Sequence, residues 1–393
     1  MATTALQAPG RWASALAVVL SLGLVFAAWQ LGGADSDSQA LSLSLLGGAL
    51  FGLLLQRSRF CFFCVTRDFI EQRKPDGLLG IIAALAVGTL GYHLVFSAFV
   101  PDPSSGRLPP DAHVGPLSWV LGLSATVFGI GMALSGSCIS AHLYRLGEGA
   151  FASLFALFGA LIGFFLGFLC WNPLYLLSIQ QAPVVWLPAW QGYGVSFLLQ
   201  IALLGGLACW LLLHVQASTE PRVVARNLRH LLFGQRWPTW VGGVLIGFLA
   251  TLSYLRVGPL GVTAELGSVA RTAADGLGWL PERLEGLDSF SGCATAVKEA
   301  LLSNNGLFIL GLVVASWASA LLAGDFQPKR PRVSELLRNL LGGVLLGWGS
   351  MLALGCTVGT LLSGIMAGAL SGWVFAVFCL VGVLLGLRIR RYW

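Results

Sequence analysis

Gly129-Ile-Gly-Met-Ala-Leu-Ser-Gly-Ser-Cys138 aligns without gaps on Gly347-Trp-Gly-Ser-Met-Leu-Ala-Leu-Gly-Cys356. Each stretch ends in a cysteine and is followed by a short segment containing Gly and Ser and then by a long apolar run. Earlier in each half, Gly47-Gly-Ala-Leu-Phe-Gly52 matches Gly242-Gly-Val-Leu-Ile-Gly247. Two matched blocks in the same order indicate an internal repeat. A chance likeness between Gly-rich helices is the weaker explanation.

The composition around these blocks is that of a protein embedded in lipid. Charged residues make up 10% of the 393 residues, against about 25% in an ordinary soluble domain, and the mean hydropathy is +0.81. A membrane-spanning helix needs about 20 mostly apolar residues. Ten segments approach or exceed that length, and we therefore predict an all-α, polytopic membrane protein with about ten transmembrane helices: 12–31, 41–56, 77–99, 116–135, 150–170, 193–214, 238–255, 306–323, 338–354 and 370–387.

The repeat also predicts how the chain is divided. Five long segments separate the start of the first repeat from the start of the second. An odd number reverses direction if the short stretches between helices return to the side they entered from, so we expect two inverted, pseudo-symmetric repeats with a substrate site between them. The predicted parts are an extra N-terminal helix in 1–40, the first repeat in 41–170, an external linker, an extra helix and a basic cytoplasmic loop in 171–237, and the second repeat with a basic tail in 238–393.

The basic residues predict the orientation. Cytoplasmic loops of membrane proteins are enriched in Lys and Arg. If the N-terminus is cytoplasmic, only five of the 23 Lys and Arg residues fall on the opposite side: Arg107, Arg256, Arg271, Arg283 and Lys298. We therefore expect both termini in the cytoplasm. The net charge of +6 follows from this distribution, and no basic patch with interleaved exposed aromatic residues predicts binding to nucleic acid.

Four short stretches interrupt the apolar pattern, and three of them contain a cysteine. Non-helical backbone survives at membrane depth only where it is buried in protein or lines a cavity. We predict a re-entrant turn followed by a short helix at each place: 57–70 with Cys61, 136–149 with Cys138, 256–272 without a cysteine, and 355–369 with Cys356.

This arrangement suits a small anion. A short helix that begins at such a turn directs its free N–H groups and the positive end of its dipole into the cavity. A thiol is a weak, polarisable donor that can bind a sulfur or selenium anion without holding it too tightly. We predict substrate binding by Cys61, Cys138 and Cys356, with the turns shaped by Gly136, Ser137, Gly355 and Thr357.

Other cysteines and charges leave alternatives open. Cysteine is also a small buried hydrophobic residue, and we expect that role for the cysteines in helix bodies, Cys170, Cys209 and Cys379. Cys64 lies one helical turn beyond Cys61, and Cys293 lies in an external linker; the roles of both stay open. Arg67 beside Asp68, and Arg145 near Glu148, either form ion pairs that hold a turn or attract the substrate. One Cys138–His142 pair is weak evidence for a metal site, and we expect no metal or cofactor.

Together these motifs resemble the YeeE/YedE family of bacterial inner-membrane proteins, over roughly residues 41–387. The likeness rests on Gln56-Arg-Ser-Arg-Phe-Cys-Phe62 with Arg67-Asp68, Gly136-Ser-Cys-Ile-Ser140 with Tyr144-Arg-Leu-Gly-Glu-Gly149, Gly261-Val-Thr-Ala-Glu265, and Leu352-Ala-Leu-Gly-Cys-Thr-Val-Gly359 with Leu370-Ser-Gly-Trp373. The departures are the added helix 12–31, the Phe62-Phe63-Cys64 sequence, and Thr357 where the family often has Asn.

The resemblance implies uptake of thiosulfate for cysteine synthesis, with the family's path cysteines at Cys61, Cys138 and Cys356. It also implies a multi-pass protein of the bacterial inner membrane that works beside a separate, TusA-like sulfur-carrier protein. Three alternatives stay open: a transporter of selenium compounds, a membrane-embedded thiol sulfurtransferase, and a passive, channel-like permease.

Overall fold

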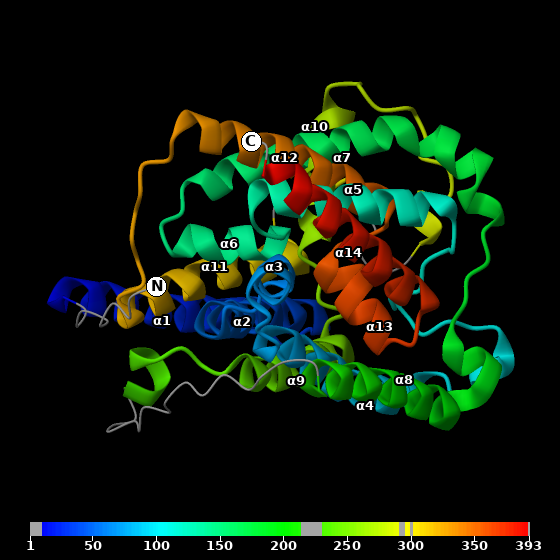
Figure 1. Ribbon diagram of the computed structural model, residues 1–393, viewed down its shortest axis with the longest axis horizontal. Helices are drawn as coiled ribbons and strands as arrows, with labels where there is room; N and C mark the ends of the chain where they lie inside the picture. Colours follow the sequence, from blue (N-terminus) through cyan, green and yellow to red (C-terminus); the bar gives the residue numbers. More distant parts are fainter. Residues whose placement is uncertain (1–9, 214–229, 291–294, 299–301, 392–393) are drawn as a thin grey trace.

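The computed structural model describes residues 10–213, 230–290, 295–298 and 302–391 and is all-helical, without a β-strand in these residues (Figure 1). The long helices match all ten predicted segments: α1 (Arg11–Leu31), α2 (Ser36–Ser58), α4 (Asp76–Phe99), α5 (Trp119–Ser135), α7 (Ala152–Leu177), α8 (Leu187–Leu213), α9 (Thr239–Arg256), α11 (Asn304–Ala323), α12 (Val333–Leu352) and α14 (Leu370–Arg390).

Short helices follow the predicted breaks at all four places. They are α3 (Phe62–Gln72), α6 (Ile139–Gly147), α10 (Thr263–Gly276), and the π-helical η5 (Thr357–Ser363) with α13 (Gly364–Met366). Single turns lie in the connections: η1 (Pro103–Ser105), η2 (Ile179–Gln181), η3 (His230–Gly234) and η4 (Leu287–Ser289).

The membrane-spanning character is confirmed by length and composition. Among the described residues, nine helical segments are long and apolar enough to cross a membrane. Two of these segments are interrupted spans, in which a short helix continues a long one. They are Ser36–Gln72, formed by α2 and α3, and Trp119–Gly147, formed by α5 and α6. A tenth span results only if α12 and Thr357–Met366 are counted together. These two segments are bent by 45° relative to each other at the break that contains Cys356. The core therefore contains interruptions where the cysteines lie.

The helices meet in pairs that repeat between the two halves. In α2, Gly48 lies so close to α11 that an added Cβ would collide with the Phe308 backbone. In α9, the matched Gly243 is equally close to the Gly80 backbone of α4. Small residues let helix backbones approach in a membrane, where packing drives association. This matched packing favours the predicted repeat.

The equivalent helices α5 and α12 run in opposite directions against each other. Gly131 of α5 lies beside Gly342 near the start of α12, whereas Ser124 lies beside Gly349 near its end. This antiparallel packing favours the predicted inversion of the repeats, which itself stays a prediction. In Figure 1 the connection between α11 and α12 lies at the left end of the bundle, and that between α7 and α8 lies at the right end.

Two helices have other ends than the predicted segments 150–170 and 193–214. α7 continues to Leu177 although it contains Pro173, and α8 begins at Leu187 but is kinked at Gly192 (φ 74°), directly before the predicted start. The extension is held by the segment before η4, because the Trp171 indole donates to the Glu285 carbonyl at 2.8 Å and Asn172 bonds the same segment. The helix predicted over 41–56 begins earlier, at Ser36, because Asp35 caps α2 by accepting from the Ser38 N–H at 3.0 Å.

Two expectations lie outside the described residues. Most of the basic loop expected within 171–237, including Arg222, Arg226 and Arg229, falls in 214–229, and Cys293 falls in 291–294.

Candidate functional site

The first interruption places Cys61 at the start of α3. α2 ends where Arg59 adopts a left-handed conformation (φ 49°), and the chain then turns so that Cys61 is the N-cap of α3. The Cys61 carbonyl accepts from Val65 at 3.0 Å, and its side chain is completely buried. The thiol therefore lies beside the free N–H groups of a helix start, where partial positive charge gathers.

The second interruption repeats this arrangement with Cys138. Gly136 has a φ of 81°, which suits glycine, and it ends α5 so that Cys138 becomes the N-cap of α6. The Cys138 thiol lies 3.3 Å from the Ser140 hydroxyl. Ser137 is buried at this turn, between Gly136 and Cys138 in the chain, and its hydroxyl donates to the Gly136 carbonyl at 2.7 Å.

The two thiols meet across the interruptions. The Cys61 side chain interacts directly with the side chains of both Cys138 and Cys64. Arg145, at the end of α6, turns back and donates to the Gly136 carbonyl at 3.2 Å and to the Cys64 sulfur at 3.3 Å. A guanidinium thus lies at the Cys64 thiol and near the Cys61 thiol, which is a favourable setting for an anion.

The third cysteine lies at a separate turn. Leu354 (φ 55°) and Gly355 (φ 151°) break the chain after α12, and Cys356 is the N-cap of η5. Its sulfur accepts from the Val358 N–H at 3.4 Å and also hydrogen-bonds the Thr263 side chain, at the start of α10. The interruption without a cysteine therefore contributes a hydroxyl to the Cys356 thiol.

Burial unites the three cysteines. Cys61, Cys138 and Cys356 are each at most 1% exposed and belong to one contiguous buried cluster. Thr357, beside Cys356, has a buried hydroxyl with no hydrogen-bond partner in the described part of the chain. A buried polar group left without a partner costs about 1–3 kcal/mol, so a polar guest at this turn would relieve that cost.

A pocket of about 480 Å³ opens beside Cys64 and the end of α6; we call it the basic pocket. Its lining includes five basic side chains, Arg59, Arg67, Lys74, Arg145 and Arg236, against three acidic ones, Asp68, Asp76 and Glu148. A neighbouring pocket of about 560 Å³ shares part of this lining and adds the basic residues of the α11–α12 connection. The excess of positive charge raises the local concentration of anions.

Glu148 is a partly buried carboxylate of the basic pocket. It accepts from the Gln56 amide at 3.3 Å, and that amide also donates to Asp325 at 3.0 Å. Burial raises the pKa of Glu148 above its ordinary value, while Arg145 and Arg59 oppose the rise and Asp325 adds to it. Glu148 therefore takes up a proton at a higher pH than an exposed glutamate does.

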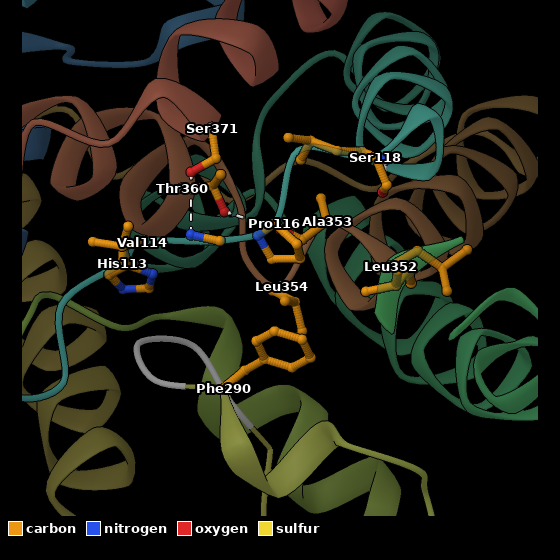
Figure 2. A pocket seen from close by; sticks show the side chains of 13 residues that line it. His113, Val114, Pro116, Ser118, Phe290, Leu352, Ala353, Leu354, Thr360 and Ser371 are labelled. Carbon is orange, nitrogen blue, oxygen red and sulfur yellow. Dashed lines mark hydrogen bonds between the residues drawn. The ribbon is translucent and has the colours of Figure 1, made fainter. Parts of the chain in front are cut away.

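A second pocket lies beside the Cys356 turn; we call it the His113 pocket (Figure 2). Leu352, Ala353, Leu354 and Thr360 line it from that turn. Figure 2 shows Thr360 and Ser371 directed into its wall, where they hydrogen-bond the Ala353 carbonyl at 3.3 Å and the Gly115 N–H at 3.2 Å. Its volume is about 20 Å³, little more than the space of one water molecule.

The His113 pocket is lined by neutral groups. Burial lowers the pKa of His113 to about 4, so the imidazole is uncharged near neutral pH. The two ends of the molecule thus differ: one has a wide basic pocket and the other a narrow uncharged one. The start of α5 and the end of α12 line the narrow pocket, whereas the end of α5 and the start of α12 line a basic pocket that includes Arg390.

The two arginines predicted near the turns, Arg67 and Arg145, have different kinds of partners. Arg67 forms the expected ion pair with Asp68, at 2.6 Å, and lies over the Phe63 ring. Arg145 forms no ion pair with Glu148 within the described residues and bonds Gly136 and Cys64 instead. Its position between a turn carbonyl and a thiol could not be inferred from spacing along the chain.

Thr263 is the residue that sequence reasoning missed. The stretch Gly261-Val-Thr-Ala-Glu265 was expected to form an interruption, but without a cysteine it offered no candidate side chain. Its position could have indicated a role, because Thr263 lies at the start of α10 much as Cys61 lies at the start of α3. The Nδ1 atom of His142 lies 3.2 Å from the Ser153 hydroxyl, whereas its buried Nε2 atom has no hydrogen-bond partner in the described part of the chain.

Comparison with known proteins gives a consistent picture. The model of a family described as "Sulphur transport" matches residues 57–385 of this chain, and so includes all three cysteine turns.

Two curated relatives align over most of the chain. The thiosulfate transporter TsuA of Escherichia coli is 25% identical over 355 residues, which is 86% of this chain and 91% of the relative. The thiosulfate transporter TsuA of Spirochaeta thermophila is 28% identical over 355 residues, or 86% of this chain and 95% of the relative. The probable transporter YedE of Escherichia coli is 32% identical over 85 residues, 21% of each chain.

Proposed function

The chain belongs to the sulphur transport family, and from that premise we propose that it is a transporter, without enzymatic activity, that imports thiosulfate or a close relative across the bacterial inner membrane. Two relatives that align over most of its length are thiosulfate transporters. The proposal also rests on the thiols at the starts of short helices, which offer weak donors to a sulfur-containing anion.

The observation that supports the route best is the position of the cysteines between the two pockets. Cys356 lies beside the narrow His113 pocket, whereas Cys138 and Cys61 lie towards the basic pocket. In the proposed sequence the anion first contacts Cys356 and Thr357, then the Cys138 and Cys61 thiols. It then leaves through the basic pocket. Weak binding at successive sites lets an anion enter and also leave.

The turns and nearby arginines have supporting roles in this proposal. Gly136, Ser137 and Gly355 fix the turns so that each thiol faces the buried cluster. Arg145 stabilises the anion beside Cys138 and Cys61, and Arg67 adds to the positive field of the pocket. The small volume of the His113 pocket means that this conformation is closed at the Cys356 end.

The distribution of basic residues supports the direction. Residues of the α2–α3 turn, the α11–α12 connection and the end of α14 all line the basic pocket or the pockets beside it, so this end faces the cytoplasm and both termini are cytoplasmic. A separate, TusA-like sulfur-carrier protein is the proposed acceptor at this face. Stimulation of uptake by added carrier protein supports that step, and an unchanged rate contradicts it.

Uptake of radiolabelled thiosulfate into proteoliposomes tests the function. We expect saturable uptake that thiosulfate competes strongly, selenite and sulfite less strongly, and sulfate weakly, because sulfate has no exposed sulfur for a soft thiol to contact. Preferential competition by selenite identifies a selenium-compound transporter instead. Release of sulfite together with a stable persulfide on a cysteine identifies a sulfurtransferase and contradicts the proposal.

A further inference from the structure

Cys64 is a buried thiol that the proposed route does not use. It follows Cys61 in the sequence Cys61-Phe-Phe-Cys64, at the start of α3. We propose that Cys61 and Cys64 form a reversible intramolecular disulfide, which makes uptake responsive to the thiol redox state on the side of the basic pocket. The two thiols, their environment and their different access to that pocket support this inference.

The local geometry allows the bond without rebuilding the helix. Cys61 is the N-cap of α3 and Cys64 lies in its first turn, and the two side chains interact directly. Helix residues three apart have their Cβ atoms about 5–6 Å apart, whereas a disulfide needs about 3.5–4.5 Å. Cys61 is the N-cap and has extended backbone, so its side chain can close this gap by a local shift outside the helix. Both cysteines are free thiols in the structure. The Arg145 guanidinium, which donates to the Cys64 sulfur at 3.3 Å, stabilises the thiolate form that exchange requires.

Access to the pair runs through Cys64. Cys64 lines the basic pocket and accepts a hydrogen bond from the Arg145 guanidinium at 3.3 Å. Cys61 is completely buried behind it, and Cys138 does not line that pocket. The excess of basic side chains attracts anionic reagents. The oxidant that fits is therefore a small anionic disulfide, for which glutathione disulfide is the probe.

The exchange proceeds in two balanced steps. The Cys64 thiolate attacks one sulfur of the oxidant, so that a Cys64–glutathione disulfide forms and one glutathione thiolate leaves. The Cys61 thiolate then attacks the Cys64 sulfur, so that the Cys61–Cys64 bond forms and the second glutathione thiolate leaves. The protein loses two electrons and two protons, and the oxidant becomes two glutathione molecules.

Oxidation removes the S–H group with which Cys61 would bind the passing anion. Arg145 keeps its bond to the Gly136 carbonyl but faces a disulfide in place of a thiol. The loss of uptake rests on the proposed function, whereas formation of the bond does not. Bond formation and uptake are therefore measured separately.

The bond is tested on the full-length protein in detergent, equilibrated with graded ratios of reduced to oxidised glutathione. Free thiols are then trapped with N-ethylmaleimide and the protein is digested with trypsin. Both cysteines lie between Arg59 and Arg67, so they fall on one tryptic peptide, Phe60–Arg67, while Cys138 falls on another. We expect this peptide to lose both maleimide adducts together and to regain them with dithiothreitol. A Cys61–Cys138 link between two peptides, or glutathione retained on Cys64, overturns the proposal.

Uptake is tested in proteoliposomes equilibrated with the same redox buffers. We expect oxidation to lower wild-type uptake reversibly by about tenfold or more. The uptake rate of Cys64→Ser should be the same in oxidising and in reducing buffer. Cys209→Ser, which removes an exposed thiol of α8, is the matched control and should stay as sensitive as wild type. Equal sensitivity of Cys64→Ser overturns the switch even if the bond forms. Absence of uptake in every reduced sample contradicts the proposed function and leaves the peptide result to decide the bond.

Discussion

At the scale of single residues, the site depends on which group begins each short helix. Cys61, Cys138 and Cys356 are N-caps, so each thiol lies at the electropositive start of a helix. Thr263 begins the fourth short helix and reaches the Cys356 thiol. The Thr263 hydroxyl thus contacts Cys356, whereas Cys61 and Cys138 contact each other. This hydroxyl positions the Cys356 sulfur.

The role of Thr263 can be tested by removing only its hydroxyl. Thr263→Val keeps the shape but loses the hydrogen bond to Cys356, which is worth about 1 kcal/mol, so uptake should fall about fivefold. Thr126→Val is the control, because the Thr126 hydroxyl donates to the Gly122 carbonyl of its own helix, at 2.8 Å, away from the cysteine turns. Rates of thiosulfate uptake in proteoliposomes provide the measurement. Equal rates for the two variants would remove Thr263 from the account.

Glu148 predicts a pH dependence on the side of the basic pocket. Its pKa is raised by burial, so as the pH falls through that value the carboxylate is neutralised and the pocket becomes more positive. Uptake or exchange from that side, at thiosulfate concentrations below saturation, should therefore rise as the pH falls. In Glu148→Gln we expect a high and flat profile over the same range.

The matched control for this profile is Asp76→Asn, another carboxylate of the same pocket. It should keep the pH dependence of the wild type. A Glu148→Gln variant that still responds to pH as the wild type does would assign the effect to another group.

Part of the residue-scale picture could be predicted from sequence and part could not. The three cysteines stood out because they occur at matched interruptions of apolar helices. The contacts of Arg145 could not be predicted, because its side chain reaches back to the Gly136 carbonyl, nine residues earlier in the chain, and across to Cys64 of α3. Pattern along the chain gives positions on helices, whereas contacts between interruptions depend on how the helices pack.

At the scale of helices, glycine controls how closely the pairs approach. Gly48 and Gly243 occupy matched positions in the two repeats and face the backbone of a neighbouring helix in each case. Added volume in a tightly packed core forces shifts that cost about 1–3 kcal/mol. The two positions should therefore tolerate substitution equally badly.

Thermal unfolding in detergent checks this expectation. Gly48→Ala and Gly243→Ala should each lower the melting temperature by a few degrees, since about 1 kcal/mol shifts Tm by about 2–4 °C in proteins of about 150–250 residues and by less in a longer chain. Gly205→Ala in α8 is the control, since nothing lies within 4 Å of its added Cβ. It should be neutral or slightly stabilising because Ala favours helix. A neutral result at only one of the matched pair would argue against equivalent packing of the repeats.

Helix existence was more predictable than helix length. Every long apolar segment is a helix because backbone groups in lipid must be satisfied within the segment. The end of α7 was missed because the sequence there contains Pro173 and polar Asn172, which suggest a loop. Tertiary contacts from Trp171 and Asn172 to residues near Glu285 hold the extra turns in place.

At the scale of the whole molecule, the two ends differ in charge and width. The basic end is assembled from segments far apart in sequence, and the opposite end contains the narrow His113 pocket. With the basic end in the cytoplasm, a small anion would enter past neutral groups and leave into a positive field. If the repeats are inverted as predicted, one chain can supply a cysteine turn near each end.

Reporter fusions test the orientation. Alkaline phosphatase inserted after Gly106, an exposed turn in the α4–α5 connection, should be active because that connection is predicted to be periplasmic. Green fluorescent protein fused after Trp393 should be fluorescent because the C-terminus is predicted to be cytoplasmic. The opposite pattern would invert the proposed direction of transport.

The central claim is that the anion passes three thiols in one buried path. Its most direct test is the initial rate of thiosulfate uptake in proteoliposomes for Cys61→Ala, Cys138→Ala and Cys356→Ala, with each variant's melting temperature measured in parallel and Cys170→Ala as the control from a helix body. We predict that each of the three substitutions lowers the rate at least about tenfold while the protein stays folded, and that Cys170→Ala transports like the wild type. Wild-type rates in all three folded variants would contradict the account.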